Sequence, residues 1–278
     1  MPGAYVQATP PRRRWPVAGA VFVVVASVTV GFVVYAQSKV IDSPRIAPIG
    51  ANATTVYDTF VGPAGQRVDP ALWTTRPDDS AVVDNGVQRY STSQDNASVD
   101  GAGHLSITAQ RVADGVTSAE LTSTSAFTFG RVEARIELPV GGGLYPAFRL
   151  ISTDLTTTGE PVGTIDAVEP TGDGDYRSGI STTPDGGSST SIMPLPSSDG
   201  YHVYWIERGP GVVTTGIDST VVHRATADDL GGSSANWVFD QPFRVQIDLR
   251  VGTTPSDPTE SIALPAAMSI DWVRTRSD

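Results

Sequence analysis

The sequence predicts one large all-β domain. The chain of 278 residues contains 28 glycines and 21 prolines, and clusters of Ser, Thr and Asp lie between its apolar stretches. Such punctuation is typical of many short strands joined by turns. No long apolar stripe with a period of 3.6 residues is present, and the chain shows no internal repeat. The length therefore suits a single β domain, once an N-terminal segment is set aside.

The N-terminal segment is an uncharged and mostly apolar run over residues 15–38, preceded by Arg12, Arg13 and Arg14. A helix that spans a membrane needs about 20 apolar residues, whereas the core of a signal peptide has about 7–15. The run therefore predicts a membrane anchor. Its basic flank over residues 1–14 is expected to stay cytoplasmic, which puts the rest of the chain outside.

Two further features complete the predicted domain organisation. Val34-Tyr35-Ala36 matches the small-residue pattern of a cleavage site, so secretion after cleavage of a signal segment is the alternative to an anchor. Prolines and a glycine interrupt residues 39–55, which predicts a linker. The β domain then covers residues 56–278.

The charge of the exported part limits its partners. After Ala36 the chain carries 16 basic and 30 acidic residues. A surface this acidic argues against nucleic acid or anionic lipid as the main partner and favours a neutral ligand. The chain has no cysteine, so its core must stabilise it without disulfides.

The stretch Gly163–Glu169 predicts a strand because it is rich in Thr, Ile and Val and is bounded by a glycine and a proline. Strict alternation places Thr164 and Asp166 on one face and Glu169 on the other. One β-bulge between Asp166 and Glu169 would bring the glutamate to the face of the other two. A buried strand with an incidental carboxylate is the alternative interpretation of this stretch alone.

Other stretches predict the scaffold of the domain. Alternation over residues 104–109 places Leu105, Ile107 and Ala109 inward. Residues 130–139 alternate strictly between charged and apolar side chains, which predicts a half-buried antiparallel strand. Trp73 is expected to fill the core.

Taken in order, these motifs resemble glycoside hydrolase family 16, the laminarinase-like enzymes, over essentially all of the chain after Thr55. The resemblance implies a β-jelly-roll sandwich of two curved antiparallel sheets, with a glycan cleft across the concave sheet. The family's bulged strand reads Glu-x-Asp-x-x-Glu, for a nucleophile, a supporting aspartate and an acid/base. Glu169 matches the acid/base and Asp166 the supporting residue, whereas Thr164 stands at the nucleophile position.

The resemblance also implies that the cleft has changed. Two tryptophans of the family's cleft are replaced by Tyr145 and Arg149, an arginine by Glu120, and a third tryptophan by Arg208. With Gln88, these are the candidate substrate-binding residues. The family often binds one structural calcium ion, and Asp271 matches a ligand position, but one carboxylate is too few to define a site. No other cofactor is expected.

The chemistry of glycoside hydrolysis determines how Thr164 is expected to affect activity. A retaining glycosidase needs two carboxyl groups about 5–5.5 Å apart, one of them a nucleophile, and threonine is neutral. We therefore expect a membrane-tethered extracytoplasmic protein, impaired in hydrolysis, that recognises a cell-envelope polysaccharide. One alternative is an active hydrolase or transglycosylase with a rewired carboxylate pair, for which Glu120 and Glu160 are conceivable bases. Another is an envelope scaffold that binds no sugar. The sequence identifies no protein partner.

Overall fold

The computed structural model describes residues 57–77, 88–171, 175–183, 187–194, 200–232, 237–252 and 262–276. The predicted basic N-terminus, anchor and linker lie outside these residues, so the prediction of a membrane helix over residues 15–38 stays a prediction. Within the described ranges, no helix is long and apolar enough to cross a membrane.

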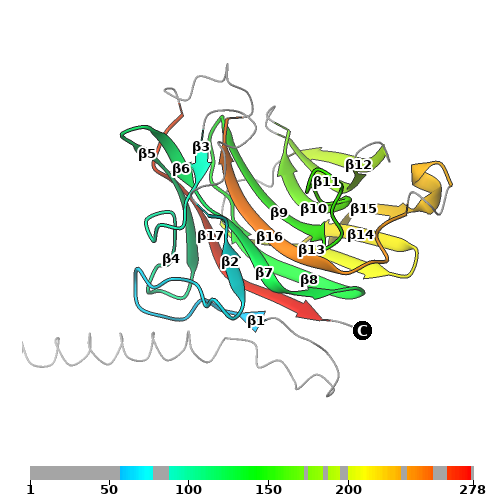
Figure 1. The fold of residues 1–278 in the computed structure, drawn as a ribbon, viewed down its shortest axis with the longest axis horizontal. Coiled ribbons are helices and arrows are strands. Elements are labelled where there is room, and N and C mark those ends of the chain that lie inside the picture. Colours follow the sequence, from blue (N-terminus) through cyan, green and yellow to red (C-terminus); the bar gives the residue numbers. More distant parts are fainter. Residues whose placement is uncertain are drawn as a thin grey trace, which may run out of the picture. The chain divides into compact units, whose positions relative to one another are not determined.

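Two sheets face each other across the core (Figure 1). The first sheet contains ten strands among the described residues, in the order β15-β14-β13-β8-β17-β5-β6-β3, with β1 beside β17 and β4 beside β5. Its strands are β1 (Tyr57–Asp58), β3 (Gln88–Tyr90), β4 (Ala97–Val99), β5 (Leu105–Val112), β6 (Gly115–Ser118), β8 (Gly130–Glu137), β13 (His202–Gly209), β14 (Val212–Ile217), β15 (Thr220–Thr226) and β17 (Ala266–Arg276).

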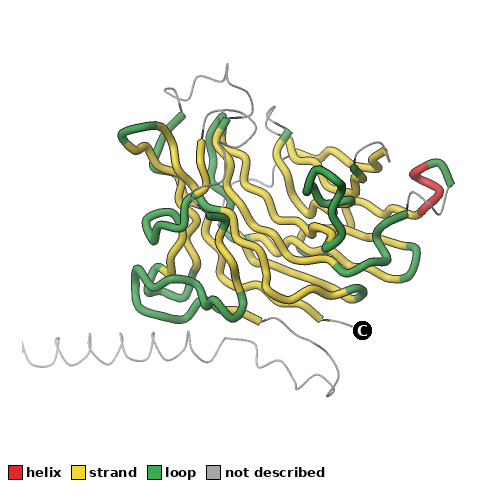
Figure 2. Tube along the Cα trace, in the orientation of Figure 1, coloured by secondary structure: helices red, strands yellow, loops and turns green. Residues whose placement is uncertain are grey.

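The second sheet contains seven strands among the described residues, in the order β12-β11-β10-β9-β16-β7-β2. These are β2 (Trp73–Thr75), β7 (Glu120–Phe127), β9 (Leu144–Ser152), β10 (Gly163–Pro170), β11 (Asp175–Thr182), β12 (Gly187–Pro194) and β16 (Phe243–Val251). All of its pairings are antiparallel, and the described chain adds one 3-10 helix, η1 (Ala227–Leu230) (Figure 2). The predicted all-β sandwich is confirmed.

The core lies between the sheets and follows the predicted alternation. In β5, Leu105, Ile107 and Ala109 are fully buried, as the pattern predicts. In β8, the apolar residues Val132, Ala134 and Ile136 are fully buried. Each such side chain contributes about 1.5–3 kcal/mol by leaving water, with alanine contributing less. Trp73 is 2% exposed and its Nε1 donates to Asp58 Oδ2 at 2.8 Å, so it fills the core as expected.

The seven-stranded sheet has two unlike faces. Its inner face packs Phe148, Leu150, Ile165 and Ile247 into the core. Residues of β9, β10 and β16 that alternate with these carry charge on the opposite face. We call that opposite face the polar face, and it carries the candidate site.

Candidate functional site on the polar face

The predicted β-bulge is present in β10. Thr164 pairs with Ser181 and Asp166 with Gly179, but the register of β10 against β11 shifts before Glu169, which pairs with Arg177. The register against β9 also shifts, between Asp166 and Val168. Because the bulge adds a residue, Val168 points into the core and Glu169 joins Asp166 on the polar face.

Residue 164, which the resemblance places at the nucleophile position, is a threonine. The Thr164 side chain is half-buried, and its Oγ1 lies 2.6 Å from Oγ of Ser181 on β11. A hydroxyl becomes a nucleophile only when a neighbouring base takes its proton. The observed partner of Thr164 is a second neutral hydroxyl, which cannot act as that base.

Arg149 links the acidic residues of the polar face. It pairs with Asp166 across β9 and β10, and its Nε lies 3.3 Å from Asp166 Oδ1. Its Nη2 lies 3.3 Å from Glu169 Oε1 and 3.9 Å from Asp248 Oδ1. The guanidinium is therefore the shared cation of three carboxylates, and it occupies a position where the resemblance predicted an aromatic platform for sugar.

Glu169 is surrounded by three guanidinium groups. Besides Arg149, Arg250 Nη2 donates to Glu169 Oε1 at 2.6 Å, and Arg177 Nη2 donates to Glu169 Oε2. Burial alone would raise the pKa of the Glu169 carboxyl, but the three arginines outweigh burial and hold that pKa below its ordinary value. Glu169 is consequently an ionised hydrogen-bond acceptor at neutral pH.

Asp166 behaves in the opposite way. Its carboxyl group is 3% exposed, and burial raises its pKa to about 6, against the lowering effect of Arg149. The negative charge of Glu169 adds to the rise. The pKa values of the two carboxyl groups on this strand therefore shift in opposite directions, because the arginines bind mainly to Glu169.

A second acidic cluster lies on β7 and β16. Glu120 pairs with Asp248 across the two strands, and the Tyr90 hydroxyl donates to Asp248 Oδ2 at 2.8 Å. Arg76 Nη1 lies 3.4 Å from Glu120 Oε2. Burial, followed by the charge of Asp248, raises the pKa of Glu120 to about 7. The Glu120 carboxyl group is therefore expected to titrate near neutral pH.

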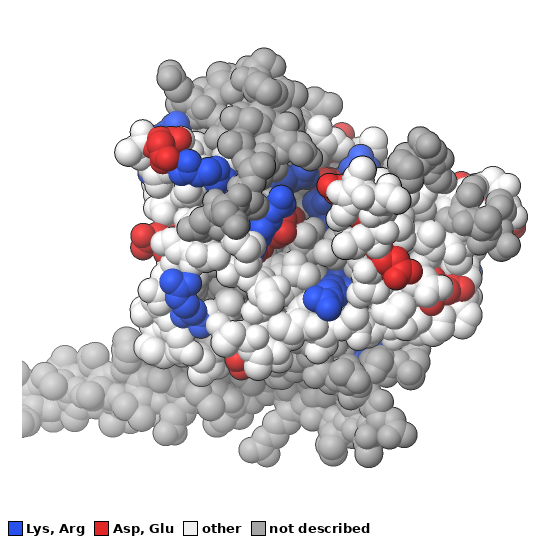
Figure 3. Space-filling model, in the orientation of Figure 1, with Lys and Arg blue, Asp and Glu red and all other residues white. Residues whose placement is uncertain are grey.

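Arginines of this face remain accessible despite their pairing. The side chains of Arg177, Arg76 and Arg250 are 47%, 39% and 30% exposed. Figure 3 shows basic side chains, all of them arginines, adjoining Asp and Glu side chains at the centre of the view, over β9 and β16 of Figure 1. The face offers alternating hydrogen-bond donors and acceptors to a ligand.

The structure brings together most, but not all, of the predicted site residues. Tyr145 lies on the polar face opposite Arg250, but it is only 8% exposed. Gln88 is 1% exposed, and its Oε1 accepts a hydrogen bond from the backbone amide of Val251. Gln88 therefore positions the end of β16 and presents no surface to a ligand.

The expectation that Arg208 lines the cleft is wrong. Arg208 belongs to β13 of the other sheet and is 1% exposed, between the rings of Phe127 and Phe243 at 5.0 and 4.6 Å. Its guanidinium donates to the backbone oxygens of Phe127, Phe239 and Gln241. The residue fills the core and replaces a cleft contact with a structural one.

Asp271 has an arginine partner. Arg135 Nη1 donates to Asp271 Oδ2, so this carboxylate is already neutralised by a cation. Within the described residues, no group of three or more His, Cys, Asp or Glu side chains could hold a metal ion. The arrangement does not favour calcium at Asp271, and the calcium site remains an untested prediction.

Sequence reasoning missed Arg177, Arg250, Asp248 and Tyr90. Their roles depend on contacts across strands that are distant in the chain. Alternation in β16 does place Gln246, Asp248 and Arg250 on one face, and that pattern was visible in the sequence. It did not indicate which neighbouring strand these side chains would meet.

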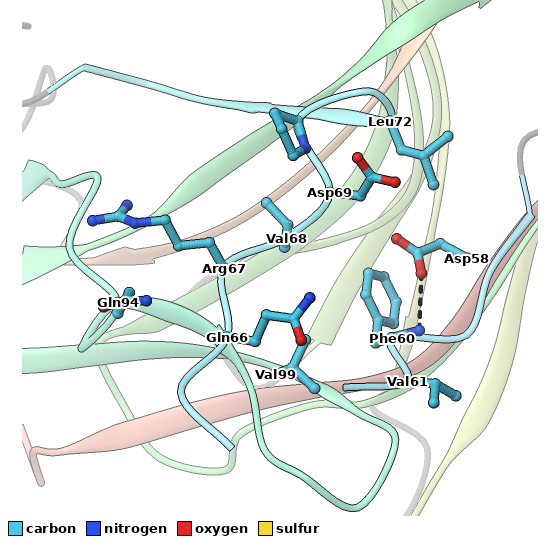
Figure 4. A pocket seen from close by; sticks show the side chains of 11 residues that line it. Asp58, Phe60, Val61, Gln66, Arg67, Val68, Asp69, Leu72, Gln94 and Val99 are labelled. Atoms are coloured by element: carbon cyan, nitrogen blue, oxygen red, sulfur yellow. Dashed lines mark hydrogen bonds between the residues drawn. The ribbon is translucent and has the colours of Figure 1, made fainter. Parts of the chain in front are cut away.

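A separate pocket of about 560 Å³ lies where β1, the chain leading to β2, and β4 meet (Figure 4). Asp58, Gln66, Asp69 and Gln94 contribute polar atoms to its lining. Asp58 already accepts hydrogen bonds from the Phe60 amide and the Trp73 indole. None of the predicted site residues lines this pocket.

Two packed β-sheets with carboxylates on a bulged strand are the arrangement that the resemblance to a glycoside hydrolase family implied. The family model described as "Glycosyl hydrolases family 16" matches residues 85–274, and the chain belongs to this family.

Similar proteins agree with the family assignment. A β-glucanase of Rhodothermus marinus is 31% identical over 179 residues, which cover 57% of this chain and 61% of that protein. A keratan-sulfate endo-1,4-β-galactosidase of Sphingobacterium multivorum is 25% identical over 54% of this chain and 37% of its own length. The chain thus spans less than two thirds of these relatives. The laminarinase catalytic domain of Thermotoga petrophila matches with a TM-score of 0.70 and 27% identity, over 82% of this chain and 98% of that one.

Proposed function

We propose that this protein is an extracytoplasmic member of glycoside hydrolase family 16 that recognises a cell-envelope glycan and is impaired in hydrolysis. The observation that carries the proposal is the state of Glu169. Arg149, Arg177 and Arg250 all bind its carboxylate, while Thr164 supplies no second carboxylate beside it.

Retaining hydrolysis fails on both requirements. The acid must hold a proton for the leaving oxygen, and the nucleophile must be a carboxylate about 5–5.5 Å away. The pKa of Glu169 lies below its ordinary value, so little of it is protonated at neutral pH. General acid catalysis contributes about 10²–10⁴-fold, and a missing nucleophile adds a further loss.

Glycan binding needs neither group. Sugar hydroxyls both donate and accept hydrogen bonds, and the polar face presents exposed guanidinium groups beside carboxylates. Charge-assisted hydrogen bonds are stronger than neutral ones. The named relatives act on a β-glucan and on keratan sulfate, so polysaccharides are the ligand class that family membership favours.

The proposed location rests on the N-terminal sequence. The apolar run over residues 15–38 with its basic flank favours a single-pass anchor and an external β domain. Cleavage near Ala36 would instead release the domain. Either topology exposes it to envelope polysaccharide, and its acidic composition makes nucleic acid an unfavourable partner.

Binding and turnover by the full chain in detergent test the proposal. We expect it to sediment with purified envelope polysaccharide, to release no reducing ends, and to lose about tenfold or more in affinity on Arg250→Gln. Arg224→Gln, an exposed position on β15 of the other sheet, is the matched control and should bind normally. Equal binding by both variants would show that the polar face is not where the glycan binds.

A second candidate function is hydrolysis with a rewired carboxylate pair. The observation that favours it is the Glu120 pKa of about 7, which leaves a protonated carboxyl on the same face as the ionised Glu169. An inverting enzyme separates acid and base by about 6.5–9.5 Å. Turnover by the wild type that disappears in both Glu120→Gln and Glu169→Gln would establish this alternative.

A further inference from the structure

A pocket of about 280 Å³ lies at one end of the seven-stranded sheet. The chain that joins β8 to β9 forms one wall, with Val140 and Leu144. The ends of β10 and β11 form the other, with Pro170 and Tyr176, and Tyr145 also lines the space. The pocket is therefore built from three strands of the seven-stranded sheet and the connection between β8 and β9.

This pocket adjoins the candidate site through Tyr145, which lines it and lies on the polar face. Tyr145 lies opposite Arg250 across β9 and β16, and Arg250 binds Glu169. A sugar placed over Glu169 would therefore have the pocket beside it.

The lining selects an apolar group. Most of the lining is apolar, with Pro139, Val140, Leu144 and Pro170 among its residues. The one charged side chain of the lining is Asp175, which disfavours an anionic substituent. The Tyr145 hydroxyl makes no hydrogen bond to any residue that the structure describes, so it can donate one to a ligand oxygen.

The size selects a small group. Pockets that hold whole drug-sized ligands measure about 300–1,000 Å³, and this one falls just below that range. A short chain with a carbonyl oxygen satisfies both the apolar walls and the phenol. A long lipid chain exceeds the space.

We propose that this pocket binds an ester-linked acyl substituent of the glycan, next to the sugar that contacts Glu169. The proposal rests on the proposed glycan-binding function and names the feature of the glycan that the protein selects. The acyl contact adds apolar area on a face where Arg149 stands in place of an aromatic platform.

The test compares three preparations of envelope polysaccharide from the cells that make this protein. They are the native material, the same material after mild alkaline removal of its esters, and the de-esterified material after partial butanoylation. The full chain is used, and its affinity is measured by calorimetry. Burial of about two apolar carbons corresponds to roughly tenfold in affinity. We expect the butanoylated material to bind about tenfold more tightly than the de-esterified material.

Two variants assign this preference to the pocket. Val140→Asp places a charge in the lining, and Gly142→Leu adds a bulky side chain at a lining residue whose Cβ would meet no atom within 4 Å. Both should abolish the preference for acylated material and leave binding of the de-esterified material unchanged. Val221→Asp, at a 58% exposed valine of the other sheet, is the matched control and should keep the preference.

The outcomes separate the two proposals. Equal affinity for de-esterified and butanoylated material, or a preference that persists in both pocket variants, would overturn the acyl site while the glycan-binding function stands. Failure of all three preparations to bind would contradict the glycan-binding function, and the acyl site with it.

Discussion

Arg149 lies directly opposite Asp166 on the neighbouring strand, and its guanidinium also reaches Glu169 at 3.3 Å. One cation therefore serves both carboxylates of the bulged strand. The side chain is 15% exposed, so water screens these interactions only weakly. This relationship links the stability of the sheet to the chemistry that its polar face can perform.

Replacement of Arg149 should therefore destabilise the domain. Arg149→Met leaves Asp166 and Glu169 without their shared partner, and removal of one member of a buried ion pair costs about 3–5 kcal/mol. Urea unfolding monitored by tryptophan fluorescence measures the loss. Arg224→Met, at an exposed position, should change the free energy of unfolding by less than about 0.5 kcal/mol. A loss below about 1 kcal/mol for Arg149→Met would contradict the shared role.

The carboxyl group of Glu120 should make stability depend on pH. Its pKa rises from 4.5 to about 7 on folding, so the native state binds more protons than the unfolded state between these values. The contribution of Glu120 is fully present below pH 4.5 and is lost as the pH rises to about 7. The shift corresponds to at most roughly 3 kcal/mol.

The measurement is the free energy of unfolding at pH 4.5 and pH 8 for the wild type and Glu120→Gln. The variant should lose less stability over this interval, because glutamine does not titrate. Glu160→Gln, at an exposed glutamate, is the control and should follow the wild type. Identical pH profiles for the wild type and Glu120→Gln would rule out this titration.

Arg208 should be a core residue in solution as well. Burial lowers the pKa of its guanidinium to about 9, and the side chain donates to three backbone oxygens. Arg208→Met keeps much of the volume but leaves those oxygens without a donor, each at a cost of about 1–3 kcal/mol. Thermal unfolding should therefore show a lower Tm for Arg208→Met, with glycan binding of the folded protein unchanged. Weaker binding without a change in Tm would indicate that Arg208 contacts the glycan in the cleft.

The sequence was sufficient for the fold and for the centre of the site. Strict alternation predicted the half-buried strand β8, because a period of two residues is a local property. Alternation alone placed Glu169 opposite Asp166, and the family resemblance implied the bulge that brings them to one face. The family resemblance added the arrangement of the two sheets.

The remainder depended on contacts between distant strands. The family pattern alone suggested that Arg208 faces the cleft, because Arg208 stands at the position of a tryptophan that contacts the ligand in that pattern. The structure instead encloses it between Phe127 and Phe243. Arg177 and Arg250 were missed because strand order, which the sequence does not specify, brings both to Glu169.

The last prediction concerns the nucleophile position. Thr164→Glu adds the missing carboxylate, yet we expect no turnover of linear β-glucan and no covalent glycosyl-enzyme by mass spectrometry. The physical reason is that Glu169 remains bound to three arginines and holds no proton to donate at neutral pH. Thr164→Glu combined with Arg149→Trp removes one of these cations and adds an aromatic ring, and stacking contributes about 0.5–1.5 kcal/mol beyond area burial.

The combined variant should therefore show measurable turnover, and adding Glu169→Gln to it should abolish that turnover, since the acid is then absent. Circular dichroism of each variant controls for folding, because Arg149 also stabilises the sheet. Efficient hydrolysis by Thr164→Glu alone would mean that the arginines do not prevent Glu169 from acting as an acid. Hydrolysis by the wild type, lost in Glu169→Gln, would overturn the proposed impairment and establish a working enzyme whose second catalytic group is not at position 164.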